Sequence, residues 1–306
     1  MLVIKPWGIW DYGFKLLSFL PKKHDETPQM LALKKIISER IFQFLLDHIP
    51  QNKIFKKIMR WLVMKLVMLN ERMIFDKRLI EFYKSNLQNK INFVIDVGAN
   101  TGQSTDLFLK LNPNCKIIAF EPIPSLYQKL KRKYSDKPNI QLFQLGISDV
   151  AGQKTFYENI FQCTSTFEEL DLTSEYLKTK SKVLGVKPDE IVKESYPIEV
   201  TTISDFINNR LTEKIDILKI DTEGHEYACL TGLFKNKLNC DIEYIQLEQH
   251  TDDMYLNRKS PDEIYDILNK NGYEIEAIIK HGFGDLVDLV FRKNDLKTYL
   301  AREADA

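Results

Sequence analysis

Cysteine is scarce in this sequence of 306 residues, and the few copies stand far apart. No two of the four form a Cys-x-x-Cys pair; they are Cys115, Cys163, Cys229 and Cys240. A structural zinc site or a disulfide framework needs cysteines at close, paired spacings. The sequence therefore argues against both, and it favours a reducing compartment.

Long uncharged apolar runs are missing as well. No stretch reaches the roughly 18 residues that a membrane-spanning helix needs. The apolar patches near the N-terminus are interrupted by Lys5, Asp11 and Lys15, and no small-residue cleavage site follows them. We therefore expect neither a spanning helix nor a signal peptide, and we expect a cytoplasmic protein.

The net charge is zero overall, but the charge is distributed unevenly. Residues 1–90 contain 17 Lys and Arg against 8 Asp and Glu, whereas residues 91–306 contain 26 against 35. The acidic body is unfavourable for binding nucleic acid, and the basic part has no recognised nucleic-acid motif. We therefore expect no nucleic-acid partner.

Residues 1–90 are predicted to form a basic, mainly helical N-terminal extension. Apolar side chains recur at helical spacings in it, and all three tryptophans, Trp7, Trp10 and Trp61, lie there. Packing of the apolar face on the main domain or on a second subunit is the usual fate of such a stripe. The alternative is a peripheral contact of residues 1–70 with an anionic membrane surface. The sequence leaves the oligomeric state open.

From residue 91 onward, β-rich runs alternate with helical patterns, which indicates an α/β fold with a mostly parallel sheet covered by helices on both faces. The predicted strands are 92–97, 116–120, 140–145, 215–220, 242–248, 273–279 and 286–291. The predicted helices are 102–111, 124–134, 225–236 and 260–271.

The main domain is expected over 91–295, followed by a polar C-terminal tail at 296–306. Its alternation is interrupted by the polar segment 160–197. That segment is long enough to be a lid or a substrate-recognition insert, although a plain surface excursion is an equal alternative.

The first predicted strand runs into a glycine-containing turn, Asp96-Val97-Gly98-Ala99-Asn100-Thr101-Gly102. Gly98 and Gly102 allow a close approach to a ligand, and the following helix offers its positive N-terminus. Asn100 stands where a dinucleotide fingerprint has its second glycine. An acid-led turn with few glycines suits a ligand that carries an amino-acid end and no pyrophosphate, and S-adenosylmethionine is such a ligand.

The next two strand ends offer further candidate contacts. Glu121, followed by Pro122, ends the second strand, where an acid can accept both hydrogens of a ribose diol. Ser148 and Asp149 follow the third strand, where either side chain could reach an adenine amino group. A turn-forming role for this Ser-Asp pair is the alternative.

Acids and histidines follow the fourth and fifth main strands. We expect Asp221, Glu223, His225, Glu248 and His250 to converge, because these strands should be neighbours. Methyl transfer usually needs a base for the acceptor proton, and histidine suits that role. Carboxylates could instead hold a divalent ion, although no metal ligand is assigned here. The alternative is that Glu223 and Glu226 only favour a helix N-terminus.

Together these motifs resemble the FkbM-type methyltransferases. The residues that carry the resemblance are the Asp96–Gly102 turn, Glu121-Pro122, Ser165-Thr166, Val200–Phe206 and Ile220–Glu226, within residues 92–292. The resemblance implies a Rossmann-like class I methyltransferase fold with a seven-stranded sheet. It also implies S-adenosyl-L-methionine as cofactor and O-methylation of a sugar, glycolipid or natural product, as in polysaccharide biosynthesis.

By the same resemblance, Asp96, Gly98, Asn100 and Gly102 form the cofactor loop and Glu121 contacts the ribose. Asp221 and Glu223 belong to an acidic motif beside the reaction centre. Two other functions remain as alternatives: a non-catalytic, membrane-docked scaffold that kept the fold, and a nicotinamide-dependent oxidoreductase. The missing glycine of the first turn speaks against the second.

Overall fold

The computed structural model describes residues 74–87, 90–184, 186–249, 253–257, 259–281 and 287–294. The predictions for residues 1–73, for His250 and for the tail at 296–306 lie outside these ranges. Within them, no helix is both long and apolar enough to cross a membrane.

A seven-stranded sheet forms the centre of the fold, with the strand order β3-β2-β1-β7-β8-β10-β9. Neighbouring strands from β3 to β8 run parallel, and β10 is antiparallel to both β8 and β9. The strands are β1 (Phe93–Val97), β2 (Lys116–Phe120), β3 (Ile140–Phe143), β7 (Ile215–Ile220), β8 (Ile242–Gln249), β9 (Tyr273–Lys280) and β10 (Val287–Lys293). The predicted α/β fold with seven main strands is confirmed.

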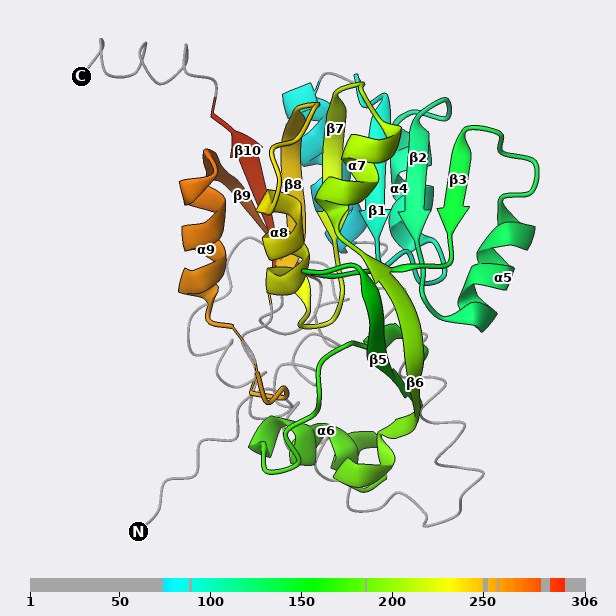
Figure 1. Cartoon of the computed structure of the whole chain (residues 1–306), viewed down its shortest axis with the longest axis vertical. Helices are drawn as coiled ribbons and strands as arrows, with labels where there is room; N and C mark the ends of the chain where they lie inside the picture. The colour runs from blue at the N-terminus through cyan, green and yellow to red at the C-terminus, as the bar shows by residue number, and fades with distance from the viewer. Residues whose placement is uncertain are drawn as a thin grey trace, which may run out of the picture.

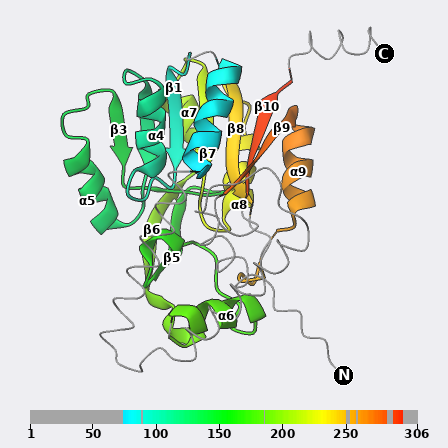
Figure 2. The same cartoon turned by 180° about the vertical axis from the view of Figure 1, so that it is seen from behind.

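Helices cover both faces of this sheet (Figures 1 and 2). One face carries α7 (Ile203–Arg210), α8 (Glu226–Phe234) and α9 (Pro261–Lys270), which pack on side chains such as Ile95. The other carries a helix over 74–87, α4 (Gln103–Leu111) and α5 (Pro124–Lys133), which pack on side chains such as Val94. All residues of β1 and β7 are buried, as is usual for central parallel strands.

The start of α9 shows how the sequence specifies a helix boundary. Ser260 accepts a hydrogen bond from the backbone N–H of Glu263, and the Glu263 carboxylate accepts one from the backbone N–H of Ser260. This reciprocal capping box satisfies two of the donors that every helix start leaves open. Pro261 occupies the first helical turn, as predicted.

The helix over 74–87 lies on the sheet, although the sequence analysis assigned it to the N-terminal extension. Its side chains Leu79, Tyr83 and Leu87 are buried in the core beside α4. The hydroxyl of Tyr83 donates to Oε1 of Gln246 in β8 at 2.7 Å, inside the protein. Apolar burial and one buried hydrogen bond therefore fix this helix to the sheet.

A second, three-stranded sheet was not predicted. Its order is β4-β6-β5, with β4 (Gly146–Ile147), β5 (Gly152–Asn159) and β6 (Val192–Thr201). The ribbon of β5 and β6 extends beyond the carboxyl ends of the main strands and carries α6 (Glu175–Leu184) at its far end (Figure 1). Both strands are rich in exposed polar residues, so their sequences lack the alternation of apolar and polar residues by which a strand is predicted.

The segment between β5 and β6 packs back toward the main domain. Leu170, Leu177 and Ile191 form an apolar cluster with Met254 and Tyr255, which lie beyond β8. The backbone adds to this contact, because the N–H of Asp171 donates to the carbonyl of Met254 at 2.8 Å. The predicted segment 160–197 is therefore anchored at the edge of the sheet where its parallel strands end.

We expect Tyr83→Phe to lower the free energy of unfolding by about 1–3 kcal/mol, because it leaves the Gln246 carbonyl buried without its donor. Urea unfolding followed by circular dichroism measures this change. Tyr127→Phe in α5 is the control, since that side chain is only partly buried. Equal stability of the two variants would contradict the docking of this helix through Tyr83.

Candidate active site

Asp96 is the residue before the last of β1 and lies at the point where strand order reverses, the usual ligand position in such sheets. It is fully buried, and its Oδ2 accepts a hydrogen bond from the Thr105 hydroxyl at 2.8 Å. Its Oδ1 has no hydrogen-bond partner among the described residues. Burial raises the pKa of Asp96 above its ordinary value, and the charge of Lys219 and the Thr105 hydroxyl offset this only in part. A buried carboxylate oxygen in this position is suited to a ligand's ammonium group.

The turn after β1 adopts conformations that favour glycine. Gly98 and Gly102 both have φ of +83°, and Asn100 has φ of +51°. A Cβ on Gly98 would lie only 1.9 Å from the carbonyl oxygen of Asp221. The N–H of Asp221 also donates to the carbonyl of Val97 at 3.0 Å. The turn after β1 and the turn after β7 are thus in direct backbone contact.

Glu121 at the end of β2 connects two loops. Its Oε2 accepts from the N–H of Asn100 and its Oε1 from the N–H of Ile123, both at 2.8 Å. Pro122 lies between Glu121 and Ile123 and has no N–H of its own to offer. Burial raises the pKa of Glu121 to about 8, while the two N–H donors act in the opposite direction. Each oxygen keeps a second lone pair, which a ribose hydroxyl can use.

Three carboxylates converge at the ends of β7 and β8. The sequence analysis predicted that these acids would meet, because the two strands were expected to be neighbours. One oxygen from each of Asp221, Glu223 and Glu248 lies within 4.8 Å of the others. They come from the end of β7, the turn after it and the end of β8. Such a spacing can surround a divalent cation or a positively charged group.

Lys219 was missed in the sequence analysis. It is buried in β7, and its Nζ donates to Oδ2 of Asp221 at 2.8 Å and lies 4.0 Å from Oδ1 of Asp96. Burial lowers the pKa of Lys219, but the charges of Asp221 and Asp96 outweigh this and raise it. The sequence did carry a signal for this residue: Lys219 stands between two apolar residues, Leu218 and Ile220, at the end of a buried strand.

The turn between β7 and α8 is held by Glu226. One oxygen of this buried side chain accepts from the N–H of Thr222 at 2.8 Å and from the N–H of Gly224 at 3.2 Å. Glu223 between them adopts a positive φ of +54°. Glu226 therefore fixes the turn that carries the acids.

His225 lies near the acids in sequence, but its ring is engaged elsewhere. It is 1% exposed, with Nδ1 2.5 Å from Oε1 of Glu168 and Nε2 2.9 Å from Oγ of Ser148. Ser148 also contacts Asp149 at 2.8 Å, so this predicted pair lies in the same network. A contact of Ser148 or Asp149 with adenine stays a prediction.

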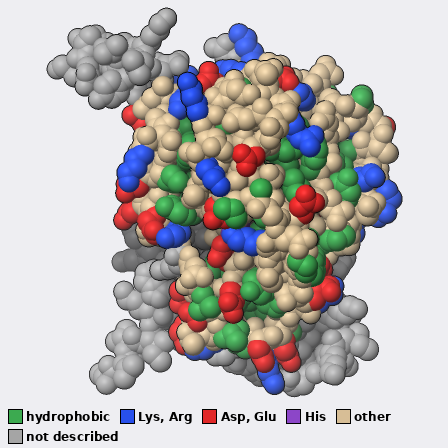
Figure 3. Space-filling model, in the orientation of Figure 1, with side chains coloured by type: hydrophobic (Ala, Val, Ile, Leu, Met, Phe, Trp, Pro, Cys, Tyr) green, Lys and Arg blue, Asp and Glu red, His purple; other side chains and the backbone are tan. Residues whose placement is uncertain are grey.

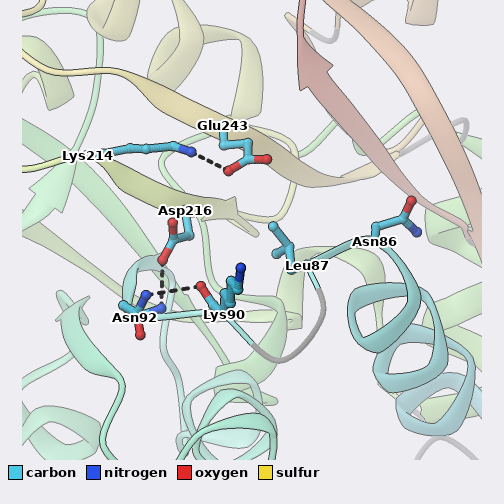
Figure 4. Close-up of a pocket in the computed structure, with 7 residues that line it drawn as sticks. All are labelled: Asn86, Leu87, Lys90, Asn92, Lys214, Asp216 and Glu243. Atoms are coloured by element: carbon cyan, nitrogen blue, oxygen red, sulfur yellow. Dashed lines mark hydrogen bonds and ion pairs between the residues drawn. The ribbon is translucent and has the colours of Figure 1, made fainter.

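A separate cavity of about 330 Å³ lies at the amino ends of the strands (Figure 4). Within it Lys214 pairs with Glu243 at 2.5 Å, and Oδ2 of Asp216 accepts from the N–H of Asn92 at 2.6 Å. Three of its charged side chains, Lys214, Asp216 and Glu243, thus already have partners within the protein. It lies at the opposite edge of the sheet from Asp96 and the acids, so it is not the cofactor site.

The features at the carboxyl edge fit S-adenosylmethionine. Oδ1 of Asp96 can accept from an ammonium group, and Glu121 follows the second strand, where an acid can accept from a ribose diol. The strand order with an antiparallel final pair is that of class I S-adenosylmethionine-dependent methyltransferases.

A family model described as the methyltransferase FkbM domain matches residues 96–275. The match spans more than half of the sequence and includes Asp96, Glu121 and the three converging acids. The chain belongs to the FkbM methyltransferase family.

Curated relatives are similar over part of the chain. "Methyltransferase sdnD" of Sordaria araneosa is 29% identical, over 46% of this chain and 60% of the relative. "Methyltransferase 1" of Beauveria bassiana is 27% identical, over 46% and 58%. "AMB antimetabolite synthetase AmbE" of Pseudomonas aeruginosa is 25% identical, over 60% of this chain but 9% of that protein. The similarity thus covers less than two thirds of each of these relatives.

Solved structures give only a distant likeness. Magnesium protoporphyrin IX methyltransferase of Synechocystis, solved with bound cofactor, is 11% identical over 89% of this chain and all of that chain, with a TM-score of 0.40. The pyocyanin biosynthetic protein PhzM is 12% identical over 91% of this chain and 66% of that chain, also with a TM-score of 0.40. The fold assignment therefore depends on the strand order and the family match.

We expect Gly98→Ala to abolish binding of S-adenosylhomocysteine, because the new Cβ would collide with the Asp221 carbonyl. Gly272→Ala is the matched control: its φ of +77° imposes the same conformational cost, but the nearest atom to the new Cβ is 3.5 Å away. Calorimetric titration of both variants measures the difference. Retained binding by Gly98→Ala would show that the contact between the two turns is not needed for the pocket.

Proposed function

We propose that this chain transfers a methyl group to a hydroxyl oxygen of a sugar, glycolipid or natural-product acceptor. The observation that carries the proposal is the backbone contact between the turns at Gly98 and Asp221. This contact sets the converging acids beside the cofactor turn, where an acceptor has to approach. S-adenosylmethionine, when bound, supplies a methyl group on a sulfonium, which is already a strong donor.

The chain's own residues then have separate tasks. Asp96 binds the ammonium group of the cofactor and Glu121 its ribose, and Asp221 or Glu223 accepts the proton that the acceptor hydroxyl loses. Lys219 favours the ionised form of Asp221, because its buried ammonium group lies 2.8 Å from that carboxylate. Correct placement of the acceptor contributes much of the rate in such a transfer. The histidine prediction for the base also includes His250, which lies outside the described residues.

The exposed apolar side chains near the acids support an acceptor with an apolar part. Leu172 and Leu256 are 51% and 53% exposed, and they flank the cluster that contains Tyr255. The Tyr255 ring in turn lies against Gly224 beside Glu223, at 2.5 Å from where a Cβ would stand. On the face shown in Figure 3, hydrophobic and acidic side chains gather over the region of the β5–β6 ribbon and α6.

A divalent cation held by Asp221, Glu223 and Glu248 is a second arrangement that the spacing supports. In that case the ion would lower the pKa of the acceptor hydroxyl. Loss of methyl transfer on treatment with a chelator, restored by Mg²⁺, would favour it over direct proton transfer to Asp221.

The remaining hypotheses concern location, partners and alternative functions. A cytoplasmic location without a nucleic-acid partner, and a peripheral membrane contact through residues 1–70, stay proposals, and those residues lie outside the described ranges. A non-catalytic scaffold remains the functional alternative, whereas the acid-led turn at Asp96 disfavours a nicotinamide-dependent oxidoreductase.

Calorimetric titration with S-adenosylhomocysteine tests the cofactor pocket. We expect wild-type binding in the micromolar range, about −8 kcal/mol, and its loss in Asp96→Ala, which removes the buried carboxylate. Asp136→Ala, at an exposed position of the same charge, is the control. Absence of binding by the wild type would favour the scaffold.

Asp221→Asn tests the catalytic step. We expect it to bind S-adenosylhomocysteine like the wild type but to transfer methyl groups about 100-fold more slowly, because it removes the proton acceptor. The measurement is transfer of labelled methyl groups to a panel of sugars, glycolipids and hydroxylated natural products. An unchanged rate, or label on a nitrogen or carbon atom of the acceptor, would reject the proposed O-methylation step.

A further inference from the structure

The segment that follows β5 is tied by side chains to the turn that carries the acids. The Thr166 hydroxyl donates to the carbonyl of Thr222 at 3.4 Å, and the Glu168 carboxylate contacts Nδ1 of His225 at 2.5 Å. The Phe167 ring lies against the His225 ring, with 5.1 Å between their centroids. His225 is therefore the buried point where this segment meets the start of α8.

The other ring nitrogen of His225 faces Ser148, and the contacts of that hydroxyl can be counted. Oγ of Ser148 lies 2.9 Å from Nζ of Lys154, 2.8 Å from Oδ1 of Asp149 and 2.9 Å from Nε2 of His225. A serine hydroxyl has one hydrogen to donate and two lone pairs that accept. An ammonium group can only donate, so Lys154 occupies one of the lone pairs.

The second and third contacts follow from the state of Asp149. Burial raises its pKa, but hydrogen bonds from Ser148 and Lys154 outweigh this and lower it, which favours a carboxylate that only accepts. The single hydroxyl hydrogen of Ser148 therefore goes to Asp149. Nε2 of His225 has to donate to the remaining lone pair, so Nε2 carries a hydrogen.

Both ring nitrogens of His225 are then engaged in hydrogen bonds within the protein. Nε2 has no lone pair left for an acceptor's proton, and Nδ1 shares a hydrogen with Glu168 at 2.5 Å. The ring is also only 1% exposed. A general base needs a free lone pair within reach of the substrate, and His225 has neither feature.

We propose that His225 is a positioning residue that locks the segment over 165–170 onto the turn carrying Asp221 and Glu223, and that it is not the general base. The lock joins three parts of the chain: Glu168 from the segment between β5 and β6, Ser148 after β4, and the N-terminus of α8. It keeps the acids and the anchored segment in one arrangement around the acceptor. An effect of the lock on catalysis rests on the proposed function of Asp221 and Glu223. The existence of the lock does not depend on that function.

Hydrogen exchange of the full chain tests the lock. In Glu168→Ala we expect amides over 165–170 and 221–226 to exchange at least tenfold faster, because the buried imidazole loses its partner. Glu169→Ala is the matched control, since it removes the same charge from an exposed neighbour. Glu168→Gln should restore part of the protection, because its side-chain amide can still hydrogen-bond to Nδ1. Equal exchange in Glu168→Ala and Glu169→Ala would overturn the proposal.

A second measurement on the wild type remains decisive if Glu168→Ala does not fold. The ring ¹⁵N spectrum of the five histidines, with the His225 signals assigned by their loss in His225→Phe, reports which nitrogen carries hydrogen. We expect a hydrogen on Nε2 of His225; a bare Nε2 would overturn the proposal.

Titration with S-adenosylhomocysteine separates this proposal from the proposed function. We expect the affinity of Glu168→Ala to stay within about twofold of the wild type, because in the part of the chain that the structure describes Glu168 bonds to His225 and not to Asp96 or Glu121. If the wild type fails to bind while exchange behaves as expected, the cofactor function fails and the lock stands. A loss of binding in Glu168→Ala as large as in Asp96→Ala would reject a role confined to the acceptor side.

Discussion

The contact between the turns after β1 and β7 is the constraint on which the site depends. The N–H of Asp221 bonds to the Val97 carbonyl, and Gly98 leaves no room for a Cβ beside the Asp221 carbonyl. These two strands are neighbours at the point where strand order reverses, so their loops meet only in the folded sheet. The turn after β1 and the turn that carries Asp221 and Glu223 therefore share one backbone contact.

Charge balance is the second constraint at this place. Asp96 and Asp221 are brought together by the sheet, and two close carboxylates repel one another when buried. Lys219 lies between them, paired with Asp221 at 2.8 Å. The ammonium group of Lys219 therefore offsets part of the negative charge that Asp96 and Asp221 bring to this place.

The part of the chain between β5 and β6 completes the site without belonging to the main sheet. Its apolar anchor uses Tyr255 beyond β8, and its polar anchor uses His225 at the start of α8. Both anchors touch the same turn, since Tyr255 packs on Gly224.

The sequence by itself determined the strands of the main sheet, the helices α4, α5, α8 and α9, the turn at Asp96 and the acid at Glu121, because local hydrophobic period and turn chemistry are written in neighbouring residues. It did not predict α7 (Ile203–Arg210), which also covers the main sheet. The paired β5 and β6 were missed, since their polar faces hide the alternation, and Lys219 was missed because its two partners lie on separate loops. Only the tertiary structure decided what His225 does. Its partners Ser148 and Glu168 are 77 and 57 residues away, and long-range packing alone brings them to its two nitrogens.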